Sequence, residues 1–218
     1  MDNMQRSRSI AWFLAIFLIL AVPLVFGMIA LEQLELHRLM HPFHSQRMDF
    51  FFRNVTHLAD GWVPTVVSLL VLVFRDVRSF LMVGLSCALS AIVVQFLKRA
   101  TFGDVDRPFM FKEELGDLHW VDGLELHHHF SFPSGHATTA FSMCFGIAVL
   151  LARPTWSITL ALLAWVLAYS RVYLSQHFTE DILAGATVGT ATAYAMYFWL
   201  YYSSFSAKPW LHRRAFRT

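Results

Sequence analysis

Six apolar stretches separated by polar segments constrain this chain to a bundle of membrane helices. A helix that crosses a bilayer core needs about 20 apolar residues. Four stretches reach or approach that length: 10–30, 79–97, 156–168 with its extension, and 182–202. Gly61 to Phe74 and Ala137 to Ala152 are shorter, so each must include neighbouring polar residues or lie within a bundle.

The composition agrees with a membrane protein. Hydrophobic residues make up 56% of the 218 residues, Phe occurs 21 times and the mean hydropathy is +0.50, more than a soluble core requires. No repeat, low-complexity tract or linker divides the chain. We therefore expect an all-α, polytopic membrane bundle of about six transmembrane helices that forms one domain over residues 1–218.

The distribution of basic residues predicts the orientation of this bundle. Cytoplasmic loops carry an excess of Lys and Arg. If six spans are drawn, one side carries two acids, Asp2 and Asp76, and nine cations: Arg6, Arg8, Arg75, Arg78, Arg153, Lys208, Arg213, Arg214 and Arg217. The other side carries thirteen acids and eight cations. Both termini are therefore predicted to be cytoplasmic, with the first apolar stretch retained as a signal anchor, since no small-residue cleavage site follows it.

Three separated polar motifs interrupt the apolar pattern. The first is Lys98 with Arg107-Pro108, the second is Pro133-Ser134-Gly135-His136, and the third is Ser170-Arg171 followed by His177 and Asp181. Three cations and a Ser-Gly pair could hold a tetrahedral anion, and two histidines could act on it. Transfer of a phosphoryl group through a covalent histidine requires these groups. The six-span topology brings all three motifs to the outer face.

The third motif contains the candidate nucleophile. On a helix, His177 and Asp181 would lie on one face, because they are four residues apart. The carboxylate could then accept a hydrogen bond from one imidazole nitrogen and leave the other free to attack phosphorus. The competing interpretation is that Asp181 only favours the dipole at the start of a helix.

The other two motifs would supply the anion-binding site and a general acid. Ser134 and Gly135 precede a predicted helix whose free N–H groups could bind an anion, and His136 is placed to protonate a leaving oxygen. An ordinary turn with a capping serine is the alternative. Arg107 and Arg171 suit bidentate contacts with phosphate, and Lys98 would contribute a point charge. The alternative is that each is a single cation at a span end, which more often reaches toward lipid headgroups.

Taken together, these motifs resemble the type 2 phosphatidic acid phosphatases, which share their core with glucose-6-phosphatase and the vanadium haloperoxidases. The second and third motifs match that family's pattern fully. The first departs from it, since eight residues separate Lys98 from Arg107 where the family has six. A loop bulge could accommodate the two extra residues, or Arg99 could replace Lys98; we prefer Lys98. The neighbouring acids Asp104 and Asp106 could turn away from Arg107 or restrain it.

The resemblance implies a role for each residue. His177 would attack phosphorus, Asp181 would orient it, and His136 would protonate the leaving group and then activate water. The phosphate would be held by Lys98, Arg107, Ser134, Gly135 and Arg171. No metal and no other cofactor is expected, because fixed cations and backbone donors neutralise the charge.

Two outer segments are predicted to lie outside the spans. Glu32 to Asp60 should contain a short interfacial helix around Gln46 to His57. Arg99 to Phe132 reads as a long loop, and such loops are often functional. Its run His127-His128-His129 suggests a metal site, but adjacent histidines rarely converge on one ion and the spacing is not that of a zinc site.

A phosphate seat at the outer boundary of a membrane bundle suits a lipid phosphate. Phosphatidic acid, phosphatidylglycerol phosphate, undecaprenyl diphosphate and lipid A all fit, and the sequence does not choose among them. We expect a bacterial inner-membrane location with a periplasmic site, no nucleic-acid partner, and an oligomeric state that the sequence leaves open. A lipid phosphotransferase, a vanadate-dependent oxidant and a non-catalytic lipid transporter are the alternatives.

Overall fold

In the computed structural model, residues 3–41 and 44–215 are described, and every regular element in these ranges is a helix. Asp2 and Arg217, two of the charges counted above, lie outside them. The α-helices are α1 Asn3–Ala30, α2 Gln33–Leu39, α3 Gln46–Val55, α4 Trp62–Phe74, α5 Val77–Ala100, α6 Lys112–Leu115, α7 Gly135–Leu151, α8 Pro154–Tyr173 and α9 Thr179–Tyr202. Short 3-10 turns, η1 Thr56–Ala59, η2 Pro108–Phe111, η3 Ser204–Ala207 and η4 Pro209–His212, complete the fold.

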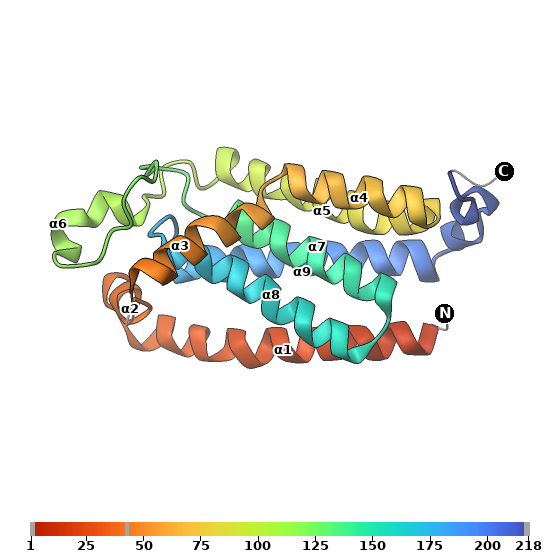
Figure 1. Cartoon of the computed structure of the whole chain (residues 1–218), viewed down its shortest axis with the longest axis horizontal. Helices are drawn as coiled ribbons and strands as arrows, with labels where there is room; N and C mark the ends of the chain where they lie inside the picture. The colour runs from red at the N-terminus through yellow and green to blue at the C-terminus, as the bar shows by residue number, and fades with distance from the viewer. Residues whose placement is uncertain (1–2, 42–43, 216–218) are drawn as a thin grey trace.

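The long helices run side by side along the molecule, and both chain ends lie at one end of the bundle (Figure 1). At the opposite end lie α2, α6 and the loop that leads from α5 to α7 (Figure 1). All six predicted apolar stretches are helical, and the predicted interfacial helix is α3 continued by η1. The short helix α2 was not predicted, because its seven residues show too little apolar periodicity.

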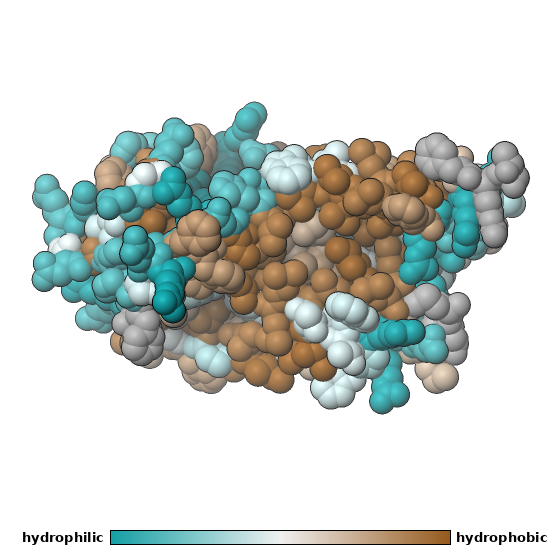
Figure 2. Space-filling model, viewed as in Figure 1, coloured by the Kyte–Doolittle hydropathy of each residue, from teal (hydrophilic) through white to brown (hydrophobic). Residues whose placement is uncertain are grey.

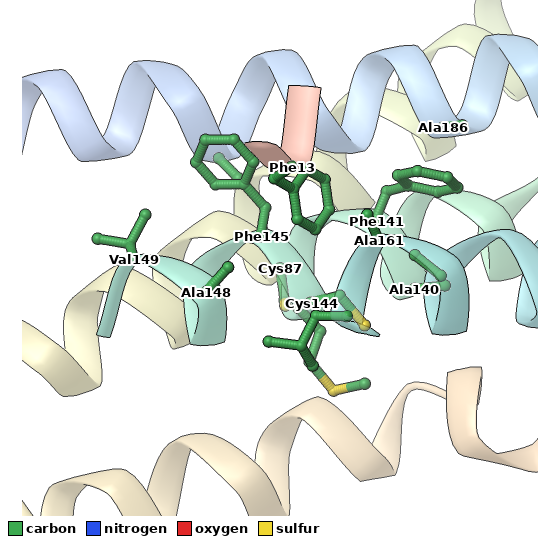
Figure 3. Packing of buried hydrophobic residues seen from close by; sticks show 14 of the residues in the cluster. Phe13, Cys87, Ala140, Phe141, Cys144, Phe145, Ala148, Val149, Ala161 and Ala186 are labelled. Carbon is green, nitrogen blue, oxygen red and sulfur yellow. The ribbon is translucent and has the colours of Figure 1, made fainter. Parts of the chain in front are cut away.

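Helix α7 occupies the centre of the bundle and packs against α5, α8 and α9. Its apolar side chains are buried on every side, as expected of a helix that is hydrophobic all round. Phe13 of α1 lies between Phe141 and Phe145 of α7 in edge-to-face contacts (Figure 3). Both free cysteines, Cys87 and Cys144, are buried in this core (Figure 3).

Two glycines allow α9 to approach α7 closely. A Cβ atom at Gly185 would lie 2.3 Å from the carbonyl oxygen of Ser134, and one at Gly189 would lie 2.4 Å from that of Thr138. Neither distance is possible for a real Cβ. The first turn of α9 is therefore held directly against the start of α7.

On the face that Figure 2 shows, an apolar belt lies between two polar ends. Helices α1, α5 and α8 are long and apolar enough to cross a membrane alone. Residues Gln46–Ala59 and Trp62–Phe74 pass the same test as a pair that bends by 54° at its break. Helix α7 is apolar but shorter. The architecture is thus an all-α membrane bundle, while the number of six spans stays a prediction.

Candidate active site

The three polar motifs meet at the end of the bundle that carries α2 and α6. Lys98 comes from the last turn of α5, Arg107 from the following loop and Arg171 from the last turn of α8. All three cations are buried, with exposed fractions of 8%, 8% and 9%. Three buried cations in one place call for an anion, because removing charge from water is costly unless it is compensated.

His177 and Asp181 form the expected pair, although not on one helix. His177 lies in the bend before α9, which begins at Thr179. Its Nδ1 is 3.3 Å from Oδ2 of Asp181, and both side chains are buried. The carboxylate is also tied to the start of the helix, because the backbone N–H of Phe178 donates to the same Oδ2 atom, at 2.9 Å. Asp181 therefore caps its helix and also contacts His177, so its place at the helix start does not exclude the pairing.

Ser131 is a further partner of Asp181 that the sequence motifs did not reveal. Its hydroxyl donates to Oδ2 of Asp181 at 2.5 Å and lies 3.4 Å from Nδ1 of His177. This hydroxyl contacts the same carboxylate oxygen as Nδ1 of His177 and the backbone N–H of Phe178. Its position two residues before the Pro133 motif is the one available sequence signal.

The second motif forms the N-terminus of α7. The hydroxyl of Ser134 accepts a hydrogen bond from the backbone N–H of Ala137, so Ser134 is the capping residue. The Ser134 backbone N–H donates to the carbonyl of Asp181 at 2.9 Å, which ties this turn to α9. The amides of Gly135 and His136 begin the helix and have no acceptor four residues earlier. They are the donors that an anion could use.

The first motif reaches the site despite its longer loop. Lys98 Nζ donates to the carbonyl of Phe130 at 2.8 Å, and Nη2 of Arg107 donates to the same oxygen at 3.3 Å. Arg107 also donates to the carbonyls of His129 and Gln176. Arg99 is exposed, which favours Lys98 as the residue that faces the site.

Asp106 turns away from the neighbouring Arg107 and contacts Nδ1 of His129 at 2.7 Å. The histidine run thus supports the site through its backbone, since the carbonyl of His128 also accepts from the Arg107 backbone N–H. Within residues 3–41 and 44–215, no group of three or more His, Cys, Asp or Glu side chains could hold a metal ion.

Arg171 is held from one side only. Its Nη1 donates to the hydroxyl of Thr56 at 3.1 Å, whereas its buried Nε has no hydrogen-bond partner in the described part of the chain. A buried guanidinium with a free donor is an incomplete arrangement. A phosphate oxygen would complete it.

His136 contacts an acid from a distant part of the sequence. Its Nε2 is 2.9 Å from Oδ1 of Asp60, and Oδ2 of Asp60 is 2.9 Å from Nδ1 of His57. Neither Asp60 nor His57 belongs to the three motifs. The sequence signal was an isolated acid next to the short apolar stretch that starts at Gly61.

The electrostatics keep the candidate nucleophile neutral. Burial, followed by the charges of Arg107 and Arg171, holds the pKa of His177 well below its usual value. Burial also lowers the pKa of Arg107, against the influence of Asp181, yet a guanidinium stays charged in proteins. A neutral imidazole beside fixed cations is the state that a phosphorus nucleophile requires.

The family model of the PAP2 superfamily matches residues 79–205, more than half of the chain. This chain belongs to the PAP2 superfamily. That assignment makes it a phosphatase and a phosphoric ester hydrolase by family. The match covers all three polar motifs, the whole of α7, α8 and α9, and all of α5 except its first two residues.

Individual relatives agree with the family. The chain is 26% identical over 161 residues to a lipid A 4'-phosphatase of Bacteroides thetaiotaomicron, covering 71% of each protein. It is 29% identical over 134 residues to an undecaprenyl-diphosphatase of Sulfolobus acidocaldarius, covering 59% of this chain and 58% of the relative.

Two solved structures share the fold. LpxE of Aquifex aeolicus is 28% identical, with a TM-score of 0.64 over 75% of this chain and 93% of that one. A phosphatidylglycerolphosphate phosphatase of Bacillus subtilis is 19% identical, with a TM-score of 0.60 over 93% of this chain and 98% of that one. The PAP2 chain described here is thus an integral membrane protein with a known architecture.

Proposed function

We propose that this protein hydrolyses a lipid phosphate monoester or diphosphate through a phosphohistidine intermediate and without a metal ion. The observation that carries the proposal is the buried His177–Asp181 pair beside three buried cations. We place the site at the outer face of a bacterial inner membrane with both termini cytoplasmic, because nine Lys and Arg residues fall on the opposite side of the predicted topology, against five on this side once Lys98, Arg107 and Arg171 are set aside.

In the first step, Nε2 of His177 attacks phosphorus, since Nδ1 is already engaged with Asp181 and Ser131. As the N–P bond forms and the P–O bond breaks, His136 gives its proton to the leaving oxygen. Asp181 stabilises the positive charge that develops on His177.

In the second step, neutral His136 takes a proton from water, the water oxygen attacks phosphorus, and the N–P bond breaks. His177 is regenerated and inorganic phosphate leaves. Lys98, Arg107, Arg171 and the helix start at Ser134 and Gly135 hold the phosphate through both steps. These fixed charges and donors stabilise the transition state without having to reorganise.

An apolar hollow next to the site supports a lipid as the substrate. It measures about 400 Å³ and lies between α4 and α5. Gly61, next to Asp60, and Thr139, one turn after His136, mark its end nearest the site. Pro64, Leu69, Leu85 and Ala88 line its walls along the belt. An acyl or isoprenoid chain in this hollow would hold its phosphate near His136.

The proposed substrate class rests on a chemical feature that the substrates of the related phosphatases share. Two relatives and one solved structure named above are a lipid A 4'-phosphatase, an undecaprenyl-diphosphatase and a phosphatidylglycerolphosphate phosphatase. Each of these lipids carries a phosphate at the headgroup boundary of a bilayer. We therefore propose a substrate from this class, with phosphatidic acid as a fourth member.

The test is phosphate release by the purified protein in detergent with EDTA present. The panel contains phosphatidic acid, phosphatidylglycerol phosphate, undecaprenyl diphosphate and lipid A, and the variants are His177→Ala and His119→Ala. His119 is a matched control, because it also contacts a carboxylate, Asp49, at 3.0 Å but lies outside the three motifs.

We expect release that needs His177, persists in EDTA and survives the His119 change. Phosphate passed to a second lipid instead of water would identify a phosphotransferase. Lipid binding without any phosphoryl transfer, unchanged in His177→Ala, would identify a transporter. Either result would refute the proposed hydrolysis.

A further inference from the structure

We propose that Asp60 is a positioning residue for the acid–base histidine, so that the site contains a second carboxylate–histidine pair, Asp60–His136, in addition to Asp181–His177. This inference rests on the proposed function, because it assigns Asp60 a task in the phosphoryl transfer step. His57 completes the arrangement from the solvent side.

The geometry is that of a carboxylate held between two imidazoles. Oδ1 of Asp60 is 2.9 Å from Nε2 of His136, and Oδ2 is 2.9 Å from Nδ1 of His57. The side chains of His136 and Asp60 are 29% and 30% exposed, whereas that of His57 is 63% exposed. His57 therefore fixes the carboxylate from the surface while the other oxygen faces the site.

Asp60 determines which nitrogen of His136 is available for chemistry. A carboxylate accepts a hydrogen bond only from a protonated nitrogen, so the contact selects the form of His136 that carries hydrogen on Nε2. Nδ1 is then the nitrogen that gives a proton to the leaving oxygen and later takes one from water. Asp60 stays ionised and moves no proton itself.

The charge of Asp60 also opposes the phosphate-binding cations. Burial, followed by the charges of Arg171 and Arg107, disfavours the protonated form of His136, and His177 is a further titratable neighbour. Asp60 is the acid in contact with His136. A His136 that must hold a proton before it can donate one therefore depends on this carboxylate.

The backbone around Asp60 is built to hold this position. The Asp60 N–H donates to the carbonyl of His57, and the Asp60 carbonyl accepts from the N–H of Val63. In the same turn, Thr56 accepts the hydrogen bond from Arg171. The 54° break between η1 and α4 falls at this point, so one bend supports both the acid and a phosphate ligand.

The experiment compares two phosphate esters in each variant. A lipid phosphate has an alkoxide leaving group that needs a proton, whereas p-nitrophenyl phosphate releases a phenolate that does not. For Asp60→Asn we expect kcat/KM to fall about 100-fold with the lipid phosphate and less than about 5-fold with the aryl phosphate, in line with the usual contribution of general acid catalysis.

The ratio of the two kcat/KM values does not depend on how much of the sample is folded. Asp60→Glu keeps the charge and should recover most of the lost ratio. Asp49→Asn is the matched control, because Asp49 also contacts a histidine, His119, and a second donor, Tyr173. It should leave both values within about twofold, because neither Asp49 nor these two partners belong to the three motifs.

With the lipid substrate, we also expect the basic limb of the pH profile of Asp60→Asn to move to lower pH. Equal losses with both esters would mean that Asp60 only supports the fold and would overturn the inference. Unchanged activity in Asp60→Asn would overturn it as well. A folded wild-type protein that releases phosphate from neither ester would instead reject the proposed function, and the inference with it.

Discussion

Replacing Gly185 by Ala tests whether the close approach of α9 to α7 sets the geometry of the site. The new Cβ would lie 2.3 Å from the carbonyl oxygen of Ser134, whereas ordinary contact begins at 3.4 Å. The obstacle is backbone, which cannot rotate away. The two helices must therefore separate by about 1 Å, and Ser134 and His136 would move away from Asp181 and His177.

A displacement of about 1 Å costs about 100-fold in rate when reacting groups must be aligned. We therefore expect Gly185→Ala to lower kcat/KM for the lipid phosphate by about two orders of magnitude. Helix propensity alone would favour the alanine by about 1 kcal/mol, so a loss cannot come from a weaker α9. The assay is phosphate release in detergent, with helix content and thermal unfolding followed by circular dichroism.

Gly27→Ala is the matched control on α1. Its Cβ would approach only the end of the Leu36 side chain, at 3.1 Å, and that side chain can rotate. We expect wild-type activity from this variant. Wild-type activity from Gly185→Ala would show that the contact between α7 and α9 does not position the site, and the reasoning would be wrong.

Three further predictions concern single side chains. Because burial keeps His177 neutral, kcat/KM should not decrease as the pH falls through 6.5. In the unfolded chain His177 binds a proton below about pH 6.5, whereas in the folded chain it does not. The free energy of unfolding should therefore decrease as the pH falls below about 6.5. A decrease of kcat/KM on the acid side of pH 6.5 that is also seen in other active variants would contradict this. Ser131→Ala should slow phosphoryl transfer about tenfold through the loss of one hydrogen bond to Asp181, as measured by burst kinetics, and an unchanged burst would refute that role. Lys98→Ala should lower kcat/KM at least about 100-fold while Arg99→Ala leaves it unchanged, and the reverse result would identify Arg99 as the phosphate ligand.

Much of this architecture could be predicted from the sequence, because apolar stretches and motif spacing are local signals. The six apolar stretches, the interfacial helix and the meeting of Lys98, Arg107, Arg171 and His177 in one place are all visible there. The four-residue spacing suggested that His177 and Asp181 share a helix, but His177 lies in the bend before α9. The side chain of Asp181 accepts a hydrogen bond from the N–H of Phe178, and α9 begins at Thr179.

The supporting residues could not be predicted, because their contacts depend on the packing of distant segments. Asp60 is 76 residues from His136, and Ser131 is 50 residues from Asp181. Thr56 is 115 residues from Arg171. Side chains of this kind are ordinary in the linear sequence, and only the close packing of α7, α8, α9, η1 and the loop before α7 gives them a role.

The carbonyl oxygen of Phe130 is a common anchor for Lys98 and Arg107. The positions of both cations are therefore set by this one carbonyl oxygen, and the number of residues between Lys98 and Arg107 can change. Chain length can vary between Lys98 and Arg107 without moving either charge, whereas a single residue added between Phe130 and Ser134 would displace the anchor and the helix start together. Insertions should accumulate before Arg107 and be absent after Phe130 wherever this site is retained.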